Sequence, residues 1–357
     1  MSEPKGPRLP VTVVVVTHNS AALVGPVLTA LLGDPAPPDE VIVVDNASSD
    51  DTRSIVSRSG VRLIALDDNL GFTGGCHRGV AAATQETVAF LGHDSVPHQG
   101  WLARLMAALD DATVGAAMAT IEQHDTPGAF NTSGGHLGYH GLAWVSDPDE
   151  AIPQEEDAPI EVAFPSGAAM AMTKETWERF GGFRRGFFMY HEDSDLGWRL
   201  RLAGLRVVRV PASRVGHDYD FSRAPDKMFW LERNRLLMLG SNYRTSTLLL
   251  LSPALAVVEA GVWTVAVRDG WIGEKVRSLP AAWRARSEVR PAKAEIQKQR
   301  RIGDSAMLAS MDTGVGSVSQ IAPPRGTSFV DRFLAGFLRL VLPIVRLFDR
   351  RDSLPTG

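Results

Sequence analysis

The chain has a single cysteine, Cys76, which sets the first limit on what it can be. One cysteine excludes an internal disulfide framework and a zinc site built from cysteines. The amino-terminal residues lack the apolar stretch of a secretory signal, so we expect the catalytic part in the cytoplasm. The net charge of -4 argues against a general nucleic-acid binder. No internal repeat is visible, and 357 residues suffice for one large α/β domain with appendages.

Buried-strand patterns alternate with helical patterns over the first 66 residues. Strands are predicted at 11–16, 41–44 and 61–66, the first being the β-branched run VTVVVV. Helices are predicted from Ser20, as a cap, through Leu31 and from about 51 to 58. Nearly continuous apolar strands are typical of a parallel sheet covered on both faces. This order predicts a doubly wound sheet with its ligand at the carboxyl ends of the strands.

A glycine-rich stretch at 69–79 leads into an alanine-rich helix. Glycines in front of a helix can let the backbone approach a phosphate-bearing ligand. The spacing matches neither a Walker motif nor a dinucleotide fingerprint, and an ordinary glycine-rich turn is the plain alternative.

Two further residues are candidates for a metal site. Asp94 follows a predicted strand at 87–91, where a carboxylate can hold a hard cation that bridges phosphates. His217 follows a strand predicted at 205–210 and can be a metal ligand. The ordinary alternatives are a turn aspartate and a structural histidine.

The stretch from Phe187 to Arg201 organises the chain. It places three carboxylates, Glu192, Asp193 and Asp195, after an aromatic-rich segment and at the start of a predicted helix. Acidic residues in a first helical turn are favoured by the helix dipole, so a charged helix start is one interpretation. A catalytic carboxylate whose direction the helix fixes is the other.

The rest of the catalytic half is predicted in less detail. Between Ser146 and Glu161 there are seven acidic residues and no basic one, which predicts a solvated loop or a lid. The remaining predicted elements are a helix at 97–109, a strand at 114–121, a small-residue strand at 165–172, a short helix at 174–180 and an amphipathic segment at 229–239.

The composition changes at residue 245. Residues 248–267 carry one charge, Glu259, and are long enough to cross a bilayer, although a buried or interfacial hairpin is an alternative. Residues 271–310 carry nine Lys and Arg against four Asp and Glu, which suits an anionic leaflet. For both C-terminal apolar segments, 248–267 and 329–348, ordinary packing in the core or in an oligomer interface is the alternative interpretation. The predicted organisation is a tail (1–10), a catalytic domain (11–245), an apolar and basic region (246–310), a linker (311–328) and an amphipathic helix with its tail (329–357).

Several motifs occur together in a characteristic order: VTVVVVTHNS, VIVVDNASSDDT, DDNLGFTGGCHRGV, LGHDSVP, FPSGAAMAM, GGFRRGFFMYHEDSDLGWRLRLAG, VGHDYDFS and ERNRLLML. Over about residues 10–245 the chain resembles the family 2 glycosyltransferases, especially bacterial rhamnosyl- and galactofuranosyl-type enzymes of cell-envelope polysaccharides. The resemblance implies a GT-A fold, which is a Rossmann-like, mostly parallel α/β sheet, followed here by a helical, membrane-associating C-terminal region.

The resemblance also implies the reaction and the residues that carry it. An inverting enzyme would move a sugar from a dTDP- or UDP-linked donor to a glycan or polyprenyl-lipid-linked acceptor, with Mg²⁺ or Mn²⁺ on the diphosphate. Asp193 matches the catalytic base and Glu192 its companion on the acceptor side. Asp94 and His217 match the metal or diphosphate site. The residues that would bind or border the donor are Thr17, Asn19, Asp45, Asn69, Gly71, Arg78 and Arg233.

Three departures from the family pattern matter. Gly92 stands where the metal motif usually has Asp or Asn, so metal binding would depend on Asp94, His217 and phosphate oxygens, or be weak. Cys76 and His77 replace the usual asparagine pair, which leaves the donor sugar open. The acidic run at 146–161 makes the acceptor loop unfamiliar.

Two alternative functions were weighed. A sugar nucleotidyltransferase would normally have a glycine-rich loop with Arg and Lys after the first strand, where this chain reads THNSAALVG. A non-catalytic nucleotide- or glycan-binding scaffold at the membrane would fit the missing metal-motif residue. The joint presence of Asp45, Asp94, Glu192, Asp193 and His217 argues against the scaffold. We therefore expect a glycosyltransferase on the cytoplasmic face of the membrane, attached as a peripheral or monotopic protein without a nucleic-acid partner.

Overall fold

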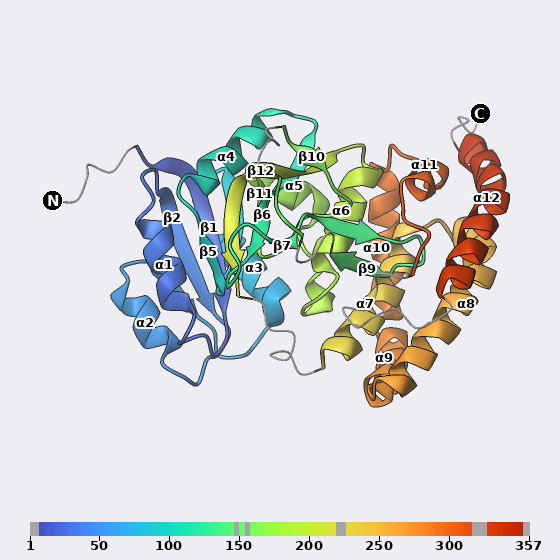
Figure 1. The fold of residues 1–357 in the computed structure, drawn as a ribbon, viewed down its shortest axis with the longest axis horizontal. Helices are drawn as coiled ribbons and strands as arrows, with labels where there is room; N and C mark the ends of the chain where they lie inside the picture. Colours follow the sequence, from blue (N-terminus) through green and yellow to red (C-terminus); the bar gives the residue numbers. More distant parts are fainter. Residues whose placement is uncertain (1–6, 146–149, 154–157, 219–225, 316–326, 353–357) are drawn as a thin grey trace. The chain divides into compact units, whose positions relative to one another are not determined.

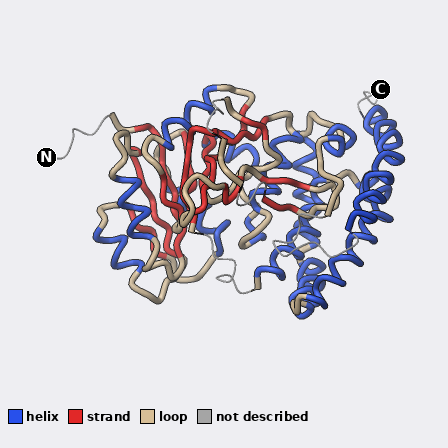
Figure 2. Tube along the Cα trace, in the orientation of Figure 1, coloured by secondary structure: helices blue, strands red, loops and turns tan. Residues whose placement is uncertain are grey.

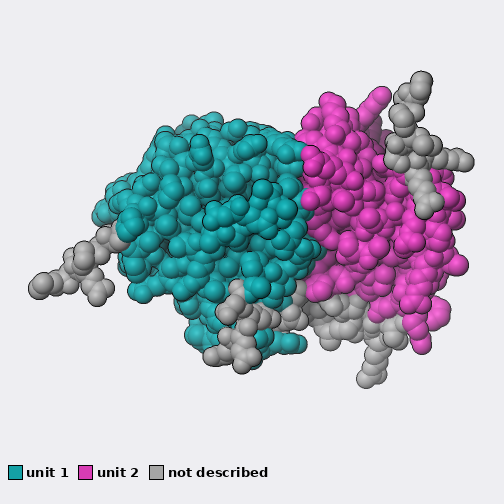
Figure 3. Space-filling model, turned by 90° about the horizontal axis from the view of Figure 1, so that it is seen from above, with its two compact units in different colours: residues 1–135, 145–197, 205–223 teal, residues 136–144, 198–204, 224–357 magenta. Residues whose placement is uncertain are grey.

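The computed structural model describes residues 7–145, 150–153, 158–218, 226–315 and 327–352 (Figures 1 and 2). The chain divides into two compact units, coloured separately in Figure 3. The first unit comprises residues 1–135, 145–197 and 205–223, and the second comprises 136–144, 198–204 and 224–357.

The first unit is built on a twisted sheet (Figure 1). Its main path runs β10-β12-β6-β11-β4-β1-β2-β3, with β5 beside β12 and β7 beside β6. Pairs β1/β2, β1/β4, β2/β3 and β6/β12 are parallel, whereas β11 is antiparallel to both β4 and β6. The strands are β1 (Leu9–Thr17), β2 (Pro38–Asp45), β3 (Arg62–Ala65), β4 (Thr87–Gly92), β5 (Ser95–Pro97), β6 (Val114–Gln123), β7 (Phe130–Thr132), β10 (Ile160–Glu161), β11 (Ala169–Thr173) and β12 (Arg206–His217). The predicted mostly parallel α/β sheet is confirmed.

Helices connect the strands of this sheet. They are α1 (Val24–Leu32), α2 (Thr52–Arg58), α3 (Gly71–Ala82), α4 (Trp101–Ala107), α5 (Lys174–Phe180) and α6 (Glu192–Leu202), with short 3₁₀ turns η1 (Ala108–Asp110) and η2 (Arg185–Phe187). Helix α6 begins in the first unit and ends in the second. The region between β6 and β11 contains β7, β10 and a small two-stranded sheet, β8 (Gly135–Leu137) with β9 (Ala143–Val145). Residues 146–149 and 154–157 of the acidic run lie outside the described residues.

Several predicted element boundaries were wrong. The small-residue strand predicted from residue 165 begins at Ala169. The Ser20 side chain does not cap a helix: its hydroxyl bonds within its own loop, donating to the His18 carbonyl at 3.2 Å, and α1 begins at Val24. The helix predicted from Pro97 begins at Trp101, because Pro97 is the last residue of β5. The strand predicted to end at residue 210 continues to His217, held by a second stretch of pairing with β6 after a register shift.

The glycines of α3 serve packing, which corrects their interpretation as a loop in front of a helix. The helix already begins at Gly71, so Gly75 and Gly79 lie inside it. A Cβ on Gly75 would be 2.5 Å from the Val16 side chain, and one on Gly79 would collide with Val14. Glycine is costly inside a helix, but here it lets α3 lie directly against β1. The carboxyl end of β1 is thereby brought close to the start of α3.

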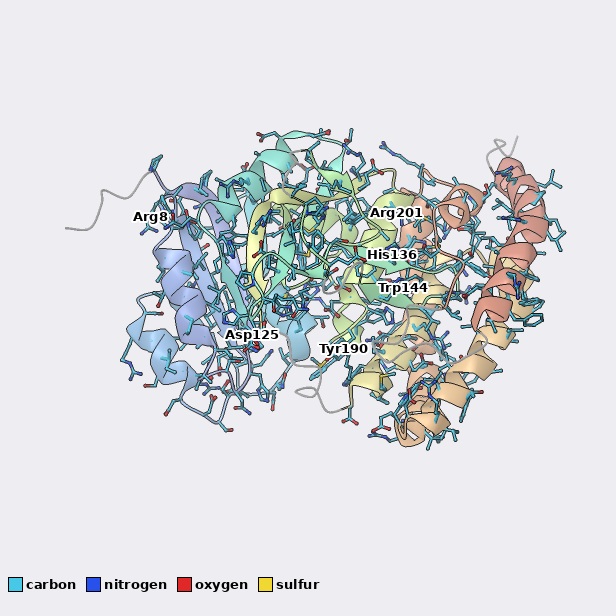
Figure 4. The ribbon with its side chains drawn as sticks, viewed as in Figure 1. Arg8, Asp125, His136, Trp144, Tyr190 and Arg201 are labelled. Carbon is cyan, nitrogen blue, oxygen red and sulfur yellow. The ribbon has the colours of Figure 1, made fainter. Side chains whose placement is uncertain are left out.

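The second unit is helical. After β8 and β9 it contains α7 (Lys227–Asn242), α8 (Thr245–Arg268), α9 (Ile272–Arg284), α10 (Arg286–Gln299), α11 (Asp304–Ala309) and α12 (Thr327–Asp352). Beside them the rings of His136 and Trp144 stack with their centroids 5.6 Å apart (Figure 4). The helices predicted within 248–267 and 329–348 are thus present. Among the described residues only α8 is long and apolar enough to span a membrane, a test of length and composition alone.

A buried ionic cluster joins three of these helices. Glu232 and Arg235 of α7 meet Glu259 of α8 and Lys275 of α9, with nitrogen–oxygen distances of 2.5–2.8 Å. The side chains of Arg235 and Lys275 are 2% and 0% exposed. Burial would raise the pKa of Glu232, but the two cations lower it to about 2. The single charge of the apolar segment, Glu259, is 29% exposed and is paired with two buried cations at the surface of the cluster.

Replacing Lys275 by methionine should lower the free energy of unfolding by about 3 kcal/mol, because removing one member of a buried ion cluster leaves its partner uncompensated. Lys298→Met is the matched control: this lysine is 73% exposed beside Glu295, and its loss should change stability by less than about 0.5 kcal/mol. Urea unfolding measures both. Equal stability of the two variants would show that the cluster does not hold α7, α8 and α9 together.

Candidate active site

The carboxyl ends of β1 and β2 form the first side of the site. Thr17 and Asp45, the last residues of these strands, are neighbours in register, and the Thr17 hydroxyl donates to Asp45 at 3.2 Å. Asp45 also accepts hydrogen bonds from the Ser48 amide at 3.0 Å and from Arg53 Nε at 2.6 Å. Burial would raise the pKa of Asp45, but the bonds from Ser48 and Arg53 lower it. Asp45 is therefore an ionised, fully buried anchor for the loop that follows β2.

Asn19 ties the loop after β1 to the loop after β2. Its backbone has a positive φ of 50°, and its side-chain oxygen accepts from the Ser49 amide at 2.8 Å. The backbone amide of Asn19 donates to the Ser48 hydroxyl at 2.9 Å. Asn19 is exposed, so it lies at the surface where a nucleotide base or ribose would meet these loops.

The start of α3 forms the neighbouring wall. The side chain of Asn69 accepts from the Gly71 amide at 2.8 Å, and Gly71 has φ +72°. Asn46 donates to the Gly71 carbonyl at 3.0 Å, which connects this wall to the end of β2. Arg78 lies farther along α3 with an exposed side chain. Hydrogen bonds within and between these loops thus bring together five of the predicted donor residues: Thr17, Asn19, Asp45, Asn69 and Gly71.

The segment before α6 has an unusual backbone. Phe188, Tyr190 and His191 have φ angles of 63°, 67° and 64°, which non-glycine residues rarely adopt (Figure 4 labels Tyr190). The Phe188 carbonyl accepts from the Thr73 amide at 3.1 Å. A Cβ on Gly71 would collide with the same carbonyl. The absence of a side chain at Gly71 therefore permits the turn that delivers Glu192 and Asp193.

The three carboxylates at the start of α6 have different environments. Asp195 is fully buried and paired with Arg184 at 2.7 Å, so it is structural. Glu192 is buried, and within the described residues its Oε2 has no hydrogen-bond partner. Asp193 keeps partial exposure and accepts from the Ser194 amide at 2.6 Å and from the Gly167 amide.

The electrostatics of this pair suit proton transfer. Burial and the charge of Asp193 raise the pKa of Glu192 well above its usual value. Desolvation raises the pKa of Asp193 to about 6, against the opposing hydrogen bonds from Ser194 and Gly167. The pKa values of both carboxylates are therefore raised, so the pair binds a proton more readily than two carboxylates in water would.

Asp94 and His217 form a second pair. The His217 Nε2 lies 3.3 Å from Asp94 Oδ1, and its Nδ1 lies 3.5 Å from Asn131 Oδ1. Burial would raise the pKa of Asp94, but the hydrogen bond and charge of His217 lower it to about 2. Among the described residues there is no group of three or more His, Cys, Asp or Glu side chains that could hold a metal. A cation here would take two protein ligands and need others from a bound ligand.

The neighbourhood of Gly92 accounts for the unusual metal motif. A Cβ at this position would lie 2.5 Å from the Ser95 hydroxyl and 2.8 Å from Asp94 Oδ1. The larger Asp or Asn of the usual motif would not fit this turn. In the described part of the chain the buried Ser95 hydroxyl has no hydrogen-bond partner, so a polar atom remains beside Asp94 that a bound ligand or water can satisfy.

One short segment connects the two pairs. The Gly92 amide, at the end of β4, donates to the Ala168 carbonyl at 2.8 Å, while the adjacent Gly167 amide donates to Asp193. On its other side β4 pairs with β1, with Val16 opposite Gly92. The loops after β1 and β2, the Asp94 pair and the Asp193 pair therefore follow one another along neighbouring strand ends of the first unit.

Arg233 belongs to the second unit. It is 9% exposed, its Nη1 donates to Asn234 at 2.7 Å, and its guanidinium lies 5.5 Å from the Trp230 ring centroid. Sequence reasoning missed four residues that shape the site in the first unit: Asn46, Arg53, Gly167 and Arg184. Arg53 and Arg184 could have been suspected, because a buried carboxylate such as Asp45 or Asp195 requires a cation.

A mostly parallel sheet with polar strand ends and an adjoining carboxylate pair defines a protein of the GT-A class. The chain belongs to glycosyltransferase family 2, a family of inverting enzymes that use nucleotide sugars. The model described as "Glycosyl transferase family 2" matches residues 12–177, and a model described as "N-terminal domain of galactosyltransferase" matches residues 158–223. This family membership favours glycosyl transfer over the nucleotidyltransferase alternative.

Curated relatives agree with the family. N-acetylglucosaminyl-diphospho-decaprenol L-rhamnosyltransferase of Mycobacterium tuberculosis is 30% identical over 246 residues, which is 60% of this chain and 78% of the relative. Polypeptide N-acetylgalactosaminyltransferase 3 of Mus musculus and the pre-mycofactocin glycosyltransferase of M. tuberculosis are each 28% identical over 60% of this chain. The chain spans only 37% and 44% of the lengths of these two relatives.

Two solved structures share the fold. GalNAc-T7 with UDP, GalNAc and Mn²⁺ has a TM-score of 0.54 and 16% identity, covering 65% of this chain and 47% of that one. The mannosyltransferase PcManGT from Pyrobaculum calidifontis, in complex with GDP-Man and Mn²⁺, has a TM-score of 0.50 and 20% identity, covering 97% and 88%. At these identities the likeness shows the fold.

Gly71→Ala should reduce turnover by at least about tenfold, because the new methyl group would displace the Phe188 carbonyl and with it the turn before Asp193. Gly60→Ala is the matched control: its φ is +76°, yet nothing lies within 4 Å of the added Cβ. Both variants carry the same backbone penalty, so only Gly71→Ala should affect catalysis beyond stability. Equal activity of the two folded variants would contradict the coupling of Gly71 to the carboxylate pair.

Proposed function

We propose that this protein is an inverting glycosyltransferase that moves a sugar from a nucleotide-diphosphate donor to a hydroxyl of a glycan or lipid-linked acceptor. The observation that carries the proposal is the desolvated Glu192–Asp193 pair, in which the pKa of Asp193 is raised to about 6. An acceptor hydroxyl attacking the anomeric carbon must lose its proton, and a positioned carboxylate of this kind can take it. No covalent enzyme intermediate is required.

The two carboxylates have separate roles in this proposal. Asp193 acts as the base, held in direction by the Gly167 and Ser194 amides. Glu192, with its unpartnered buried oxygen, orients the acceptor hydroxyl by hydrogen bonding. Asp195 has no role in the proposed proton transfer, because its carboxylate forms an ion pair with Arg184.

The donor would lie along the strand ends. Asn19 and the loops anchored by Thr17 and Asp45 would hold the nucleoside, and Asn69 and Gly71 would border it. Arg78 is proposed to bind donor phosphates. The phosphate-binding role expected of Arg233 stays a prediction, because Arg233 belongs to the second unit.

Asp94 and His217 fit a shared role in holding Mg²⁺ or Mn²⁺ on the diphosphate. A carboxylate and an imidazole are suitable ligands, and Asn131 lies where it can accept from the other ring nitrogen of His217. A cation bound there would stabilise the negative charge that grows on the departing diphosphate. Mn²⁺ accompanies the nucleotide or nucleotide sugar in both solved structures that share the fold.

The acceptor and location are proposed from the relatives and from α8. The decaprenol-linked acceptor in the name of the M. tuberculosis rhamnosyltransferase supports a polyprenyl-lipid-linked acceptor, a dTDP- or UDP-linked donor and a role in cell-envelope polysaccharide synthesis. A peripheral or monotopic position on the cytoplasmic face of the membrane would bring such an acceptor within reach.

Asp193→Asn should lower turnover by about two to four orders of magnitude while leaving donor binding intact, because an amide cannot accept the proton. In the unmodified enzyme kcat/KM should rise with pH through about 6 and then level off, since the base must be ionised. Donor consumption and transfer kinetics across pH measure both effects. Asp39→Asn, which removes an exposed carboxylate near the amino end of β2, is the control. Near-normal turnover of Asp193→Asn would refute the assignment.

Asp94→Ala should weaken binding of UDP or dTDP in the presence of Mn²⁺ by about tenfold or more, because a metal-held diphosphate loses a ligand. Binding of uridine or thymidine, which lack phosphate, should not change. Calorimetry with and without Mn²⁺ separates the two contributions. If a chelator leaves nucleotide binding by the unmodified protein unaltered, the metal role of Asp94 and His217 is wrong.

A further inference from the structure

The second unit exposes apolar side chains to an unusual degree. Of the large hydrophobic residues that are exposed in the described part of the chain, all but Leu70 lie on α8, α9 and α12. Large apolar side chains exposed on neighbouring helices mark an interaction site. Two of these helices, α8 and α12, pack against each other and lie side by side in Figures 1 and 2.

Helix α12 has two apolar rows on different sides. Leu334, Leu338, Val341 and Val345 are buried at spacings of four, three and four residues, which is the row that packs inward. A second row, which includes Phe329 (70% exposed), Leu340 (75%) and Leu347 (60%), faces outward. A surface helix normally needs only one apolar row, so the outward row requires another partner.

The charges of α12 are segregated to match an anionic partner. Arg332, Arg339 and Arg346 recur every seven residues, so they form one row along the helix, and all three are exposed. The acidic side chains described on α12 are turned inward: Asp331 accepts from the Val315 amide at 2.7 Å, and Asp349 pairs with Arg244 at 2.9 Å. Cations thus line the outward apolar row without exposed carboxylates between them.

The outward side of α8, unlike that of α12, has no charged side chain between residues 245 and 267. Its exposed positions from 245 to 267 carry no Asp, Glu, Lys or Arg, and Leu249 and Val267 are 69% and 66% exposed. In the last turn of the neighbouring α9, Trp283 is 67% exposed, and the Arg286 guanidinium lies 4.0 Å from its ring centroid. Tryptophan and arginine next to apolar residues are typical of the lipid headgroup region.

We propose that the outward faces of α8 and α12, with Trp283 of α9, form one surface that inserts into an anionic lipid leaflet, and that α8 lies in the plane of this leaflet and does not cross it. A second copy of the chain is a poorer occupant, because a symmetric contact would bring like-charged arginine rows together. Anionic headgroups complement the same rows.

The inward side of α8 explains why it does not span the bilayer. Six of its residues are buried against the protein, at Thr247, Leu251, Ala254, Val258, Val262 and Ala266. Glu259 is held by Arg235 at 2.6 Å and by Lys275 at 2.5 Å. A transmembrane position would expose this carboxylate to lipid and leave two buried cations without it, which is costly. This inference concerns the second unit alone and holds whichever sugar is transferred.

Vesicle flotation of the full-length chain tests the surface. The protein should float with phosphatidylcholine vesicles that contain about one third phosphatidylglycerol, and less well with pure phosphatidylcholine. Leu340→Glu should weaken this binding by about tenfold or more, since it places a charge in the apolar row. Ala294→Glu, which adds the same charge at an exposed position of α10, should have no effect. Equal binding of the two variants would overturn the proposal.

The arginine row has its own test. The triple change Arg332→Gln, Arg339→Gln and Arg346→Gln should reduce binding to the anionic vesicles by on the order of a hundredfold at low salt. It should leave binding to neutral vesicles unchanged. Failure of the unmodified protein to bind any vesicle, with a dimer that Leu340→Glu converts to monomers, would show that a second copy covers this face.

Labelling distinguishes an in-plane helix from a span. Thr245→Cys and Arg268→Cys each place a thiol at an exposed end of α8, and the native Cys76 is buried. With protein added to the outside of sealed vesicles, a membrane-impermeant maleimide should react with both positions. Protection of one end only would show that α8 spans the bilayer. None of these readouts requires a sugar donor, so they remain informative if the proposed transferase activity is not found.

Discussion

The site depends on two adjacent carboxylates, one buried and one partly exposed, for which the described residues provide no neutralising cation. Glu192 and Asp193 lie at the start of α6, where the helix dipole and the Ser194 and Gly167 amides compensate them only in part. The third carboxylate, Asp195, would add repulsion if Arg184 did not pair with it. The Asp195–Arg184 ion pair therefore stabilises the structure, and the desolvated Glu192–Asp193 pair is left for the proposed proton transfer.

The conformation of the backbone before α6 is set by the same need to position the two carboxylates. To present the two carboxylates, residues 188–191 adopt a turn with three positive φ angles, which local sequence does not favour. The turn is held from outside by α3, through Gly71 and the Thr73 amide. Helix α3 in turn lies close to β1 because its glycines permit it. The nucleotide side and the proposed base are therefore linked through one helix rather than assembled independently.

Much of the fold was predictable because short stretches of sequence define its strands and helices. The runs VTVVVV and VIVV are buried on both faces, and their alternation with short helices defines the parallel sheet. The candidate site was partly predictable for the same reason, since Thr17, Asp45 and Asp94 stand directly after strands. The hydrogen-bond partners of the site residues were not predictable. Nothing near Gly167 in the sequence indicates that its amide donates to Asp193, and nothing near Asn131 indicates that its side chain lies beside His217. Such contacts depend on the register of distant strands.

The sequence by itself determined the main strands and helices of the first unit, the order of the strands' polar ends, and the family to which the chain belongs. These follow from hydrophobic periodicity and motif order, which are local properties. Only the tertiary structure decided that the glycines of α3 serve packing, that Asp195 differs from Asp193, and that Glu259 of α8 pairs with two buried cations. In each case the deciding quantity is the environment of a side chain, which is set by residues far away along the chain.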